Sequence, residues 1–449
     1  MSGDGRRAGP PLSRVGSRVS RAAVDFGRFV RTARQAGALV VQPRMGFGGP
    51  AEMRAGLTAT RNAAATTAGT ITLDSYTRVG DLRAVEAALR DGADLNGYPI
   101  VSHPDAVTGR VLAGLVGDDF PVQVRHGSAN PVDIFRALLR VGLSATEGGP
   151  VSYCLPYGRT PLETSVRNWD RACEILCRAR ESGVEPHLET FGGCMLGQLC
   201  PPGLLVAISL LEALFFHRHG LRDLSVSYAQ QTNAAQDQEA VLALRRLCAE
   251  FLPDTRWHVV IYTYMGMYPA SREGAYQLLG QAAELAVATG SERLIVKTEA
   301  EASRIPTIAE NVAALEYAAG AARRARPILI SGDFAEDSQV YAEARTLVEA
   351  VLNLHDDMGK ALLIAFRRGF LDIPYCVHPD NMGRTRSYID QRGRLRWGNI
   401  GLLPLRDVVD TSYAHALSSA ELLRSLSYVR RKFDEGGSAD PISAQGVHR

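Results

Sequence analysis

Ala-Thr-Glu-Gly-Gly-Pro-Val-Ser-Tyr-Cys-Leu-Pro-Tyr-Gly, residues 145–158, is the stretch from which the fold can be worked out. The apolar run 141–143 ahead of it predicts a strand, and a carboxylate, a Gly-Gly-Pro turn and two tyrosines follow. A polar loop of this kind suits a small ligand. For this loop alone, a capped turn with two half-buried tyrosines explains the sequence equally well.

Other predicted strands end in the same way. Residues 38–43 are followed by Arg44, the run from Thr70 leads to Arg78, and the strand from Phe120 ends at Arg125. Strand and helix alternate eight or nine times with short connections, which predicts an α/β fold, a (β/α)8 TIM-type barrel, with residues 95–102 outside the ring.

The carboxyl ends of parallel barrel strands meet at one face, so polar residues distant in sequence are expected around one pocket. Those residues are Arg44, Arg78, Arg125, Glu147, Tyr228 and Lys297. Structural ion pairs at the rim of the barrel are the alternative explanation.

The alternation of strand and helix stops after about residue 331, and this change predicts the domain organisation. We expect a basic flexible tail over 1–23, the barrel over 24–331, a smaller C-terminal segment packed on the barrel over 332–433, and a flexible tail over 434–449. The C-terminal segment has helical patterns at 340–354, 358–366 and 415–432, separated by an irregular region over 372–399.

Composition narrows the class of protein. The 449 residues carry a formal net charge of +2, which favours neither nucleic acid nor a membrane as partner. Eight arginines against two aspartates in residues 1–36 fit a solvated tail, with a nucleic-acid arm or a targeting peptide as alternatives. The apolar run 203–216 is too short to span a membrane, and no signal peptide is visible, so a cytoplasmic protein is expected. Seven cysteines without a CxxC pair exclude a zinc ribbon, and no metal site is predicted.

The basic residues are almost all arginine. Only Lys297, Lys360 and Lys432 are lysines. Because an ammonium group is more compact than a guanidinium fork, a lysine at a predicted strand end suggests a tight site.

Three arginines and one carboxylate on one face indicate an anionic ligand that also carries an amino group. Guanidinium forks bind carboxylates, and Glu147 with the nearby tyrosines Tyr153 and Tyr157 suits an ammonium group. The pattern therefore describes an amino dicarboxylic acid. The sequence has no Ser-His-Asp order, no HExxH and no convincing GxGxxG after a strand.

Seven strings in order resemble one family. They are VQPR (41–44), SYTR (75–78), LNGYP (95–99), QVRHGS (123–128), EGGPVSYCLPY (147–157), VSYAQQTNAAQD (226–237) and IVKTEAEASRIPT (295–307). Together they resemble the large, epsilon subunit of glutamate mutase (methylaspartate mutase) over about residues 26–325, and more weakly beyond.

The resemblance implies an adenosylcobalamin-dependent radical isomerase that interconverts L-glutamate and (2S,3S)-3-methylaspartate. It implies that three arginines hold the substrate carboxylates, that a glutamate and two tyrosines handle the amino group and neighbouring contacts, and that further residues contact the cofactor. At the matching positions these are Arg44, Arg78 and Arg125 for the carboxylates; Glu147, Tyr153 and Tyr157 for the amino group, with Glu147 and Tyr157 in catalytic roles; and Asn96, Gly97, Lys297 and Glu301 for the cofactor.

The resemblance also implies a partner. In that family a small subunit carries a DxHxxG motif whose histidine ligates cobalt, and this chain contains no such motif. A separate cobalamin-binding subunit is therefore expected, with a homodimer of this chain inside a heterotetramer.

Some positions depart from the family pattern. Tyr262 stands where a pocket histidine is expected in an HQWMGGFP segment, Ala229 and Thr232 replace glycines, and the loop 191–202 is one residue longer. A mutase acting on another amino dicarboxylic acid, or a non-catalytic paralogue that binds only a partner or ligand, are the alternatives.

Overall fold

The computed structural model describes residues 24–156, 158–194, 199–327, 338–410 and 418–436. Eight parallel strands form one sheet in the order β1-β8-β7-β6-β5-β4-β3-β2. β1 pairs with β8, and Val41 bridges Thr67 just before β2, so the sheet closes into a barrel. The predicted (β/α)8 fold is confirmed. The strands are β1 (Val40–Pro43), β2 (Gly69–Thr72), β3 (Val122–Arg125), β4 (Ala145–Gly148), β5 (His187–Thr190), β6 (Asp223–Ala229), β7 (Arg256–Tyr262) and β8 (Arg293–Val296).

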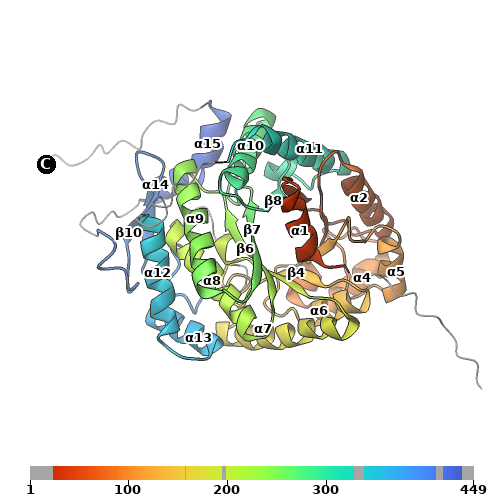
Figure 1. The fold of residues 1–449 in the computed structure, drawn as a ribbon, viewed down its shortest axis with the longest axis horizontal. Helices are drawn as coiled ribbons and strands as arrows, with labels where there is room; N and C mark the ends of the chain where they lie inside the picture. Colours follow the sequence, from red (N-terminus) through yellow and green to blue (C-terminus); the bar gives the residue numbers. More distant parts are fainter. Residues whose placement is uncertain (1–23, 157, 195–198, 328–337, 411–417, 437–449) are drawn as a thin grey trace, which may run out of the picture.

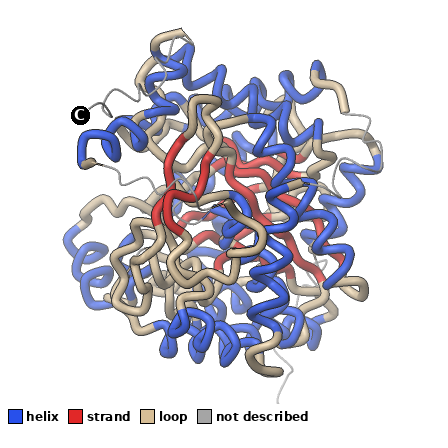
Figure 2. Tube along the Cα trace, turned by 90° about the vertical axis from the view of Figure 1, so that its left-hand side faces the viewer, coloured by secondary structure: helices blue, strands red, loops and turns tan. Residues whose placement is uncertain are grey.

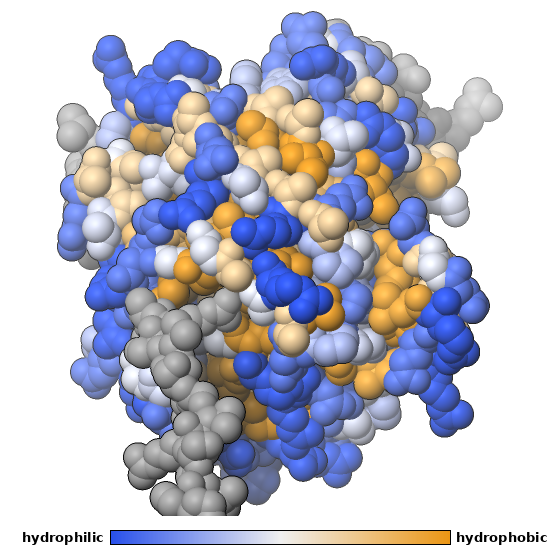
Figure 3. Space-filling view, turned by 90° about the vertical axis from the view of Figure 1, so that its right-hand side faces the viewer, coloured by the Kyte–Doolittle hydropathy of each residue, from blue (hydrophilic) through white to orange (hydrophobic). Residues whose placement is uncertain are grey.

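Helices enclose the strands on all sides (Figures 1 and 2). Those of the barrel are α1 (Phe26–Gln35), α2 (Pro50–Asn62), α3 (Ser75–Val79), α4 (Leu82–Asp91), α5 (Asp105–Leu112), α6 (Val132–Arg140), α7 (Leu162–Cys177), α8 (Pro202–Arg218), α9 (Ala234–Phe251), α10 (Arg272–Ala288) and α11 (Ile308–Arg324), with the short 3₁₀ helices η1 (Arg178–Ser182), η2 (Gly192–Cys194) and η3 (Glu299–Ala302). Of the helices in the described ranges, none is long and apolar enough to cross a membrane. The side that carries α2 and α5 is hydrophilic with separate apolar patches (Figure 3).

Burial on both faces explains the apolar strands. All residues of β1, β3, β4, β5, β6 and β8 are buried, as expected for parallel strands between a filled interior and covering helices. Residues 202–216 of α8 are all buried, because this helix packs between β6 and helix α12 (Gln339–Leu352). A helix covered on all sides is apolar around most of its circumference.

Helix α1 covers one end of the barrel and lies at the centre of the ring in Figure 1. Phe26 stacks on His187 with ring centroids 4.9 Å apart, and the Arg293 guanidinium lies 5.0 Å from the Phe26 ring. Arg31 forms an ion pair with Asp223 at 2.6 Å. The opposite end, at the carboxyl ends of the strands, is therefore the open one.

The C-terminal part adds α12 (Gln339–Leu352), α13 (Met358–Arg368), the strands β9 (Arg386–Ile389) and β10 (Leu395–Asn399), α14 (Ser419–Leu426) and α15 (Tyr428–Asp434). α12 packs on α8 and α9, and α13 packs on α7 and α8 (Figure 1). The hairpin is held by Gln236, whose side chain both donates to and accepts from the Leu395 backbone at 2.9 and 2.8 Å. Residues 328–337 and 1–23 lie outside the described residues, and the domain division stays a prediction.

Several local predictions are wrong. Residues 141–143 end α6 rather than form a strand: Gly142 has φ 79°, and the Leu143 N–H donates to Leu138 O at 2.9 Å, a helix-ending motif. The strand begins at Ala145, so Glu147 lies within it.

The segment from Thr70 to Arg78 is also not one strand. β2 ends at Thr72, and the Asp74 side chain accepts from Thr77 N at 2.9 Å, which starts helix α3. Arg78 therefore lies on a helix. The region 372–399 contains an antiparallel hairpin, and the helix expected over 415–432 is two helices, α14 and α15. Residues 95–102 lie outside the strand ring, as predicted.

Candidate active site

Arg125, Glu147 and Tyr262 meet at the open end of the barrel, on β3, β4 and β7. Arg125 Nη2 lies 2.9 Å from Glu147 Oε2, and Arg125 Nη1 donates to the Tyr262 hydroxyl at 2.9 Å. The Tyr262 hydroxyl lies 2.8 Å from Glu147 Oε2, and Tyr153 donates to Glu147 Oε1. All four side chains are buried. The structure thus brings together three of the predicted site residues, Arg125, Glu147 and Tyr153.

Beside Glu147, on the neighbouring strand, lies a second carboxylate that the sequence reasoning missed. Glu189 is the β5 residue opposite Glu147 in the strand register, and its side chain contacts the Tyr262 hydroxyl and the Arg293 guanidinium. Arg293 also donates to Gln42, Gln123 and Ser225 at 2.5, 3.2 and 3.0 Å. The available signal was one charged side chain in each of the two predicted strand segments HLET and RLIV.

The pKa values of the two carboxylates are shifted in opposite directions. Burial raises the pKa of Glu147 above its ordinary value against the attraction of Arg125. Burial would also raise the pKa of Glu189, but Arg293 and Arg125 outweigh it and hold that pKa below its ordinary value. Glu147 is therefore the carboxylate that holds a proton more readily.

A second cluster lies between the ends of β1 and β8. Arg44 Nη1 is 2.6 Å from Glu301 Oε1, and Lys297 Nζ is 3.5 Å from the same oxygen. Burial lowers the pKa of Lys297 to about 8, with Glu301 opposing. Lys297 also lies 5.1 Å from the centre of the Tyr268 ring.

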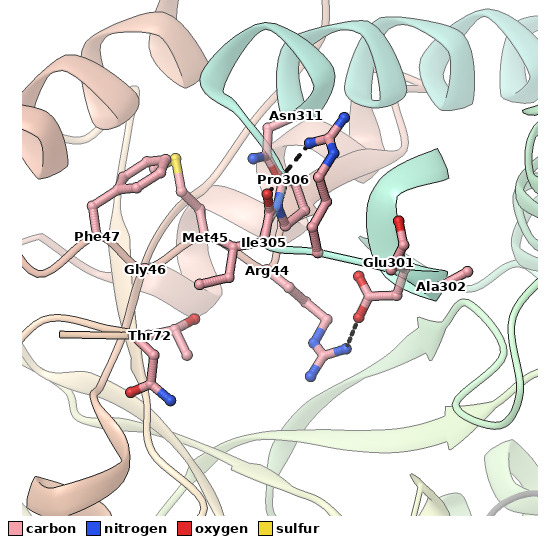
Figure 4. A pocket seen from close by; sticks show the side chains of 13 residues that line it. Arg44, Met45, Gly46, Phe47, Thr72, Glu301, Ala302, Ile305, Pro306 and Asn311 are labelled. Atoms are coloured by element: carbon pink, nitrogen blue, oxygen red, sulfur yellow. Dashed lines mark hydrogen bonds and ion pairs between the residues drawn. The ribbon is translucent and has the colours of Figure 1, made fainter. Parts of the chain in front are cut away.

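Next to this cluster is a cavity of 410 Å³ (Figure 4). Its lining residues are Arg44, Met45, Gly46, Phe47, Thr72, Asn96, Glu301, Ala302, Ser303, Arg304, Ile305, Pro306 and Asn311. The Thr72 hydroxyl is buried and has no hydrogen-bond partner among the described residues. Asn96 accepts from Ser75 N at 3.0 Å. Gly97 instead allows close packing, since a Cβ there would lie 2.5 Å from the Leu73 carbonyl carbon.

The remaining predicted residues lie apart. Arg78 is exposed on α3, and its guanidinium makes no hydrogen bond or ion pair within the described part of the chain; it passes close to Gly127. Tyr157 lies outside the described residues. Tyr228 was expected in the pocket, but its hydroxyl donates to Asp237 of α9 at 2.9 Å, so it faces the helix layer.

The Gly-Gly-Pro loop is organised by Glu212 of α8, which the sequence reasoning did not identify. Its buried carboxylate accepts from the N–H of Val151, Ser152 and Phe191 at 3.2, 2.8 and 3.3 Å and from the Ser152 hydroxyl at 3.0 Å. Burial raises its pKa to about 7. A Cβ on Gly149 would lie 2.0 Å from Glu212, which explains glycine there.

Chemically, the open end offers guanidinium groups for anions, a carboxylate with a tyrosine hydroxyl for a cation, and a polar cavity alongside. No group of three or more His, Cys, Asp or Glu side chains that could hold a metal ion occurs in the ranges that the structure describes.

Comparison with known proteins gives a consistent result. The sequence matches the family described as Methylaspartate mutase E chain (MutE) over residues 22–423. The glutamate mutase epsilon subunit of Halobacterium salinarum is 31% identical over 453 residues, 96% of this chain and 93% of that protein. That of Escherichia coli O157:H7 is 28% identical over 372 residues, 78% and 75% of the two chains. Among solved structures, the spore coat polysaccharide biosynthesis protein spsE of Bacillus subtilis aligns with TM-score 0.36 and 10% identity over 69% of this chain and 77% of that one, a likeness too weak to bear on function.

Proposed function

The chain belongs to the methylaspartate mutase E chain family, and on that premise we propose that it is the substrate-binding large subunit of an adenosylcobalamin-dependent mutase. The reaction proposed is the interconversion of L-glutamate and (2S,3S)-3-methylaspartate. The observation that carries the proposal is the buried Arg125–Glu147 pair at the strand ends, with the Arg78 guanidinium close to Gly127 and without an ion pair to any described residue.

A dicarboxylic amino acid matches these groups. Arg125 would bind one carboxylate by turning part of its fork away from Glu147, and Arg78 would bind the other. The ammonium group would then take the place of Arg125 beside Glu147, with Tyr153 fixing the Glu147 carboxylate. Arg44, the third predicted carboxylate ligand, is held by Glu301 here and would complete the binding site from the β1 side.

The residues around the 410 Å³ cavity fit the adenosyl group of the proposed cofactor. Glu301 and Asn96 offer hydrogen-bond acceptors for ribose hydroxyls, and Thr72, whose hydroxyl has no partner within the described ranges, lines the same cavity. Lys297 holds Glu301 in place. When bound, adenosylcobalamin supplies radical chemistry through its weak cobalt–carbon bond. The buried walls formed by Arg125, Glu147 and Tyr262 would exclude water from the reacting substrate.

A partner subunit follows from the same proposal, because the chain has no DxHxxG motif to ligate cobalt. Large exposed apolar side chains on the segments that follow the barrel strands support a docking surface at the open end: Tyr76 and Val79 lie on α3 after β2, Met267 follows β7, and Ile305 follows β8. We propose that the cobalamin-binding small subunit covers this end, in a heterotetramer built on a homodimer of this chain.

One observation favours a second candidate, a mutase acting on another amino dicarboxylic acid. The Tyr262 hydroxyl contacts both Arg125 and Glu147 and so occupies atoms that a substrate would use. A substrate of different length from glutamate would meet that hydroxyl differently. A non-catalytic paralogue, the third possibility named above, would need neither the Arg125–Glu147 pair nor Lys297 beside Glu301.

The test combines the purified chain with a cobalamin-binding small subunit, adenosylcobalamin and L-glutamate. Electron paramagnetic resonance would follow radical formation, and NMR would follow methylaspartate. A radical signal with product supports the proposal. Turnover of another amino diacid alone favours the second candidate, and an assembled complex silent with all of them refutes a catalytic role.

A further inference from the structure

One hydroxyl group joins the two carboxylates of the site. The Tyr262 oxygen lies within hydrogen-bond distance of Glu147 Oε2 (2.8 Å) and of Glu189 Oε1, and it accepts from Arg125 Nη1 at 2.9 Å. Tyr262, Glu147 and Glu189 are all buried, so no water screens these contacts. The geometry therefore has to be satisfied by protons within the group.

The three oxygen atoms of this group need one proton more than the Tyr262 hydroxyl supplies. A tyrosine hydroxyl has one proton, so Tyr262 can donate to only one of the two carboxylates. If both were ionised, the other oxygen–oxygen contact would join two lone pairs without a proton between them, which is unfavourable in a buried site. One additional proton on a carboxylate makes every contact a hydrogen bond.

The neighbours decide where that proton resides. Glu189 accepts from Arg293, Ser225 and Gln123 and is held ionised by them. Within the ranges that the structure describes, Glu147 forms an ion pair only with Arg125, which it shares with the Tyr262 oxygen. The directions of the two pKa shifts described above agree with a proton on Glu147.

We propose that Tyr262 links Glu147 to the Glu189–Arg293 pair in a proton-sharing chain, so that binding of a ligand's ammonium group at Glu147 expels one proton. The chain runs Tyr153, Glu147, Tyr262, Glu189, Arg293 from the open end into the barrel interior. The O–H bond of Glu147 breaks, the proton passes to solvent, and the ligand's ammonium stays protonated. This inference rests on the proposed function for the identity of the ligand.

The charged and titratable groups that face Glu147 together determine whether it is protonated. From the neighbouring elements these groups are Arg125 and His126 on or after β3, Tyr153 after β4, Glu189 on β5, Cys194 in η2 and Tyr262 on β7. Burial lowers the pKa of His126 to about 3, and burial raises the pKa of Cys194 well above its ordinary value, so both are neutral at pH 7. Of the groups named above, Arg125, Tyr153, Glu147, Tyr262 and Glu189 remain to share the proton.

Ligand affinity depends on pH through the protonation of Glu147. Below the raised pKa of Glu147 in the empty site, binding of the ammonium group releases a proton, so ligand affinity rises with pH. Above that pKa the carboxylate is already ionised, and affinity becomes independent of this group. In the pH range where Glu147 of the empty site is protonated, we expect release of about one proton per site.

The first experiment needs no ligand. Infrared difference spectra between the full-length wild type and Glu147→Gln at pH 7 should show the carbonyl band of a protonated carboxylic acid, present in the wild type and absent in the variant. Tyr264→Phe is the matched control, because the Tyr264 hydroxyl is buried and makes no hydrogen bond to any residue that the structure describes. The band of this variant should equal that of the wild type. Absence of the band from the wild type overturns the inference.

The second experiment measures proton release by calorimetry. L-Glutamate is titrated at one pH, in buffers of different protonation enthalpy, into the complex of this chain with its small subunit and hydroxocobalamin, which lacks an adenosyl group. The wild type and Tyr264→Phe should release about one proton, and Tyr262→Phe close to none. Binding without proton release, or equal release from Tyr262→Phe, overturns the inference. If the infrared band is present but L-glutamate does not bind, the assignment of glutamate as the ligand fails and the proton-sharing chain stands.

Discussion

Arg125 and Glu147 form a buried ion pair with a 2.9 Å separation, and both partners have a second contact with Tyr262. Arg125 comes from the end of β3 and Glu147 from β4, so the pair crosses between adjacent strands at the open end of the barrel. A ligand that binds here has to exchange contacts with this pair rather than fill an empty space.

Arg125→Lys should weaken binding of a dicarboxylic substrate by about 3 kcal/mol, roughly a hundredfold. An ammonium group cannot contact Glu147, Tyr262 and a ligand carboxylate in the planar arrangement that the guanidinium provides. Assembly with the cobalamin-binding subunit should persist. Binding is measured by calorimetry and assembly by size-exclusion chromatography, with the exposed Arg136→Lys as control. Near-normal affinity would refute the assignment of Arg125 to the substrate.

Glu301→Gln should lower the pKa of Lys297 below about 8. Burial and Arg44 both lower that pKa, and Glu301 is the group that opposes them, so its charge is what keeps Lys297 protonated. Because the chain has only three lysines, ¹³C-lysine NMR can follow each Cε resonance against pH. Lys360, outside this cluster, serves as the internal control. An unchanged or higher Lys297 pKa in the variant would contradict the arrangement.

Much of this arrangement was predictable, because arginines, a glutamate and a lysine at the ends of apolar runs mark the open end of a parallel barrel. Arg44, Arg125 and Lys297 were placed correctly at strand ends on that basis. Arg78 was misplaced, since the Asp74 cap that starts a helix looks like a continuing strand in an alternating sequence. The contribution of Glu189, Glu212 and Arg293 was missed because the sequence does not show which partner a charged side chain in a buried strand or helix will have. The side chains that meet across the barrel depend on the register of its strands.

Glu212→Gln should reduce the pH dependence of stability. The pKa of Glu212 is raised to about 7 by burial, from an unfolded value near 4.5. Its contribution to the free energy of unfolding is therefore complete below the unfolded pKa and is lost as pH rises through about 7, a change of about 3 kcal/mol at most. Glutamine cannot ionise, so chemical denaturation between pH 5 and 8 should give a flatter profile.

The control for that experiment is Glu163→Gln, whose side chain is 62% exposed and which should keep the wild-type profile. Glutamine has only one acceptor oxygen and cannot satisfy all four donors, so the variant should also be less stable at pH 5. An unchanged slope would show that Glu212 titrates normally.

Arg78→Ala should separate ligand binding from stability. Arg78 is exposed, and its guanidinium makes no ion pair with any residue in the described part of the chain, so its removal should leave the midpoint of thermal unfolding unchanged within error. If the guanidinium binds a substrate carboxylate, KM for L-glutamate in the assembled enzyme should rise by roughly tenfold to a hundredfold, the usual range for a lost charge-assisted hydrogen bond. Arg90→Ala, an exposed arginine on the adjacent α4, is the matched control and should change neither quantity. A rise in KM that is the same for both variants would indicate a general loss of positive charge, and an unchanged KM for Arg78→Ala would remove this residue from the carboxylate site.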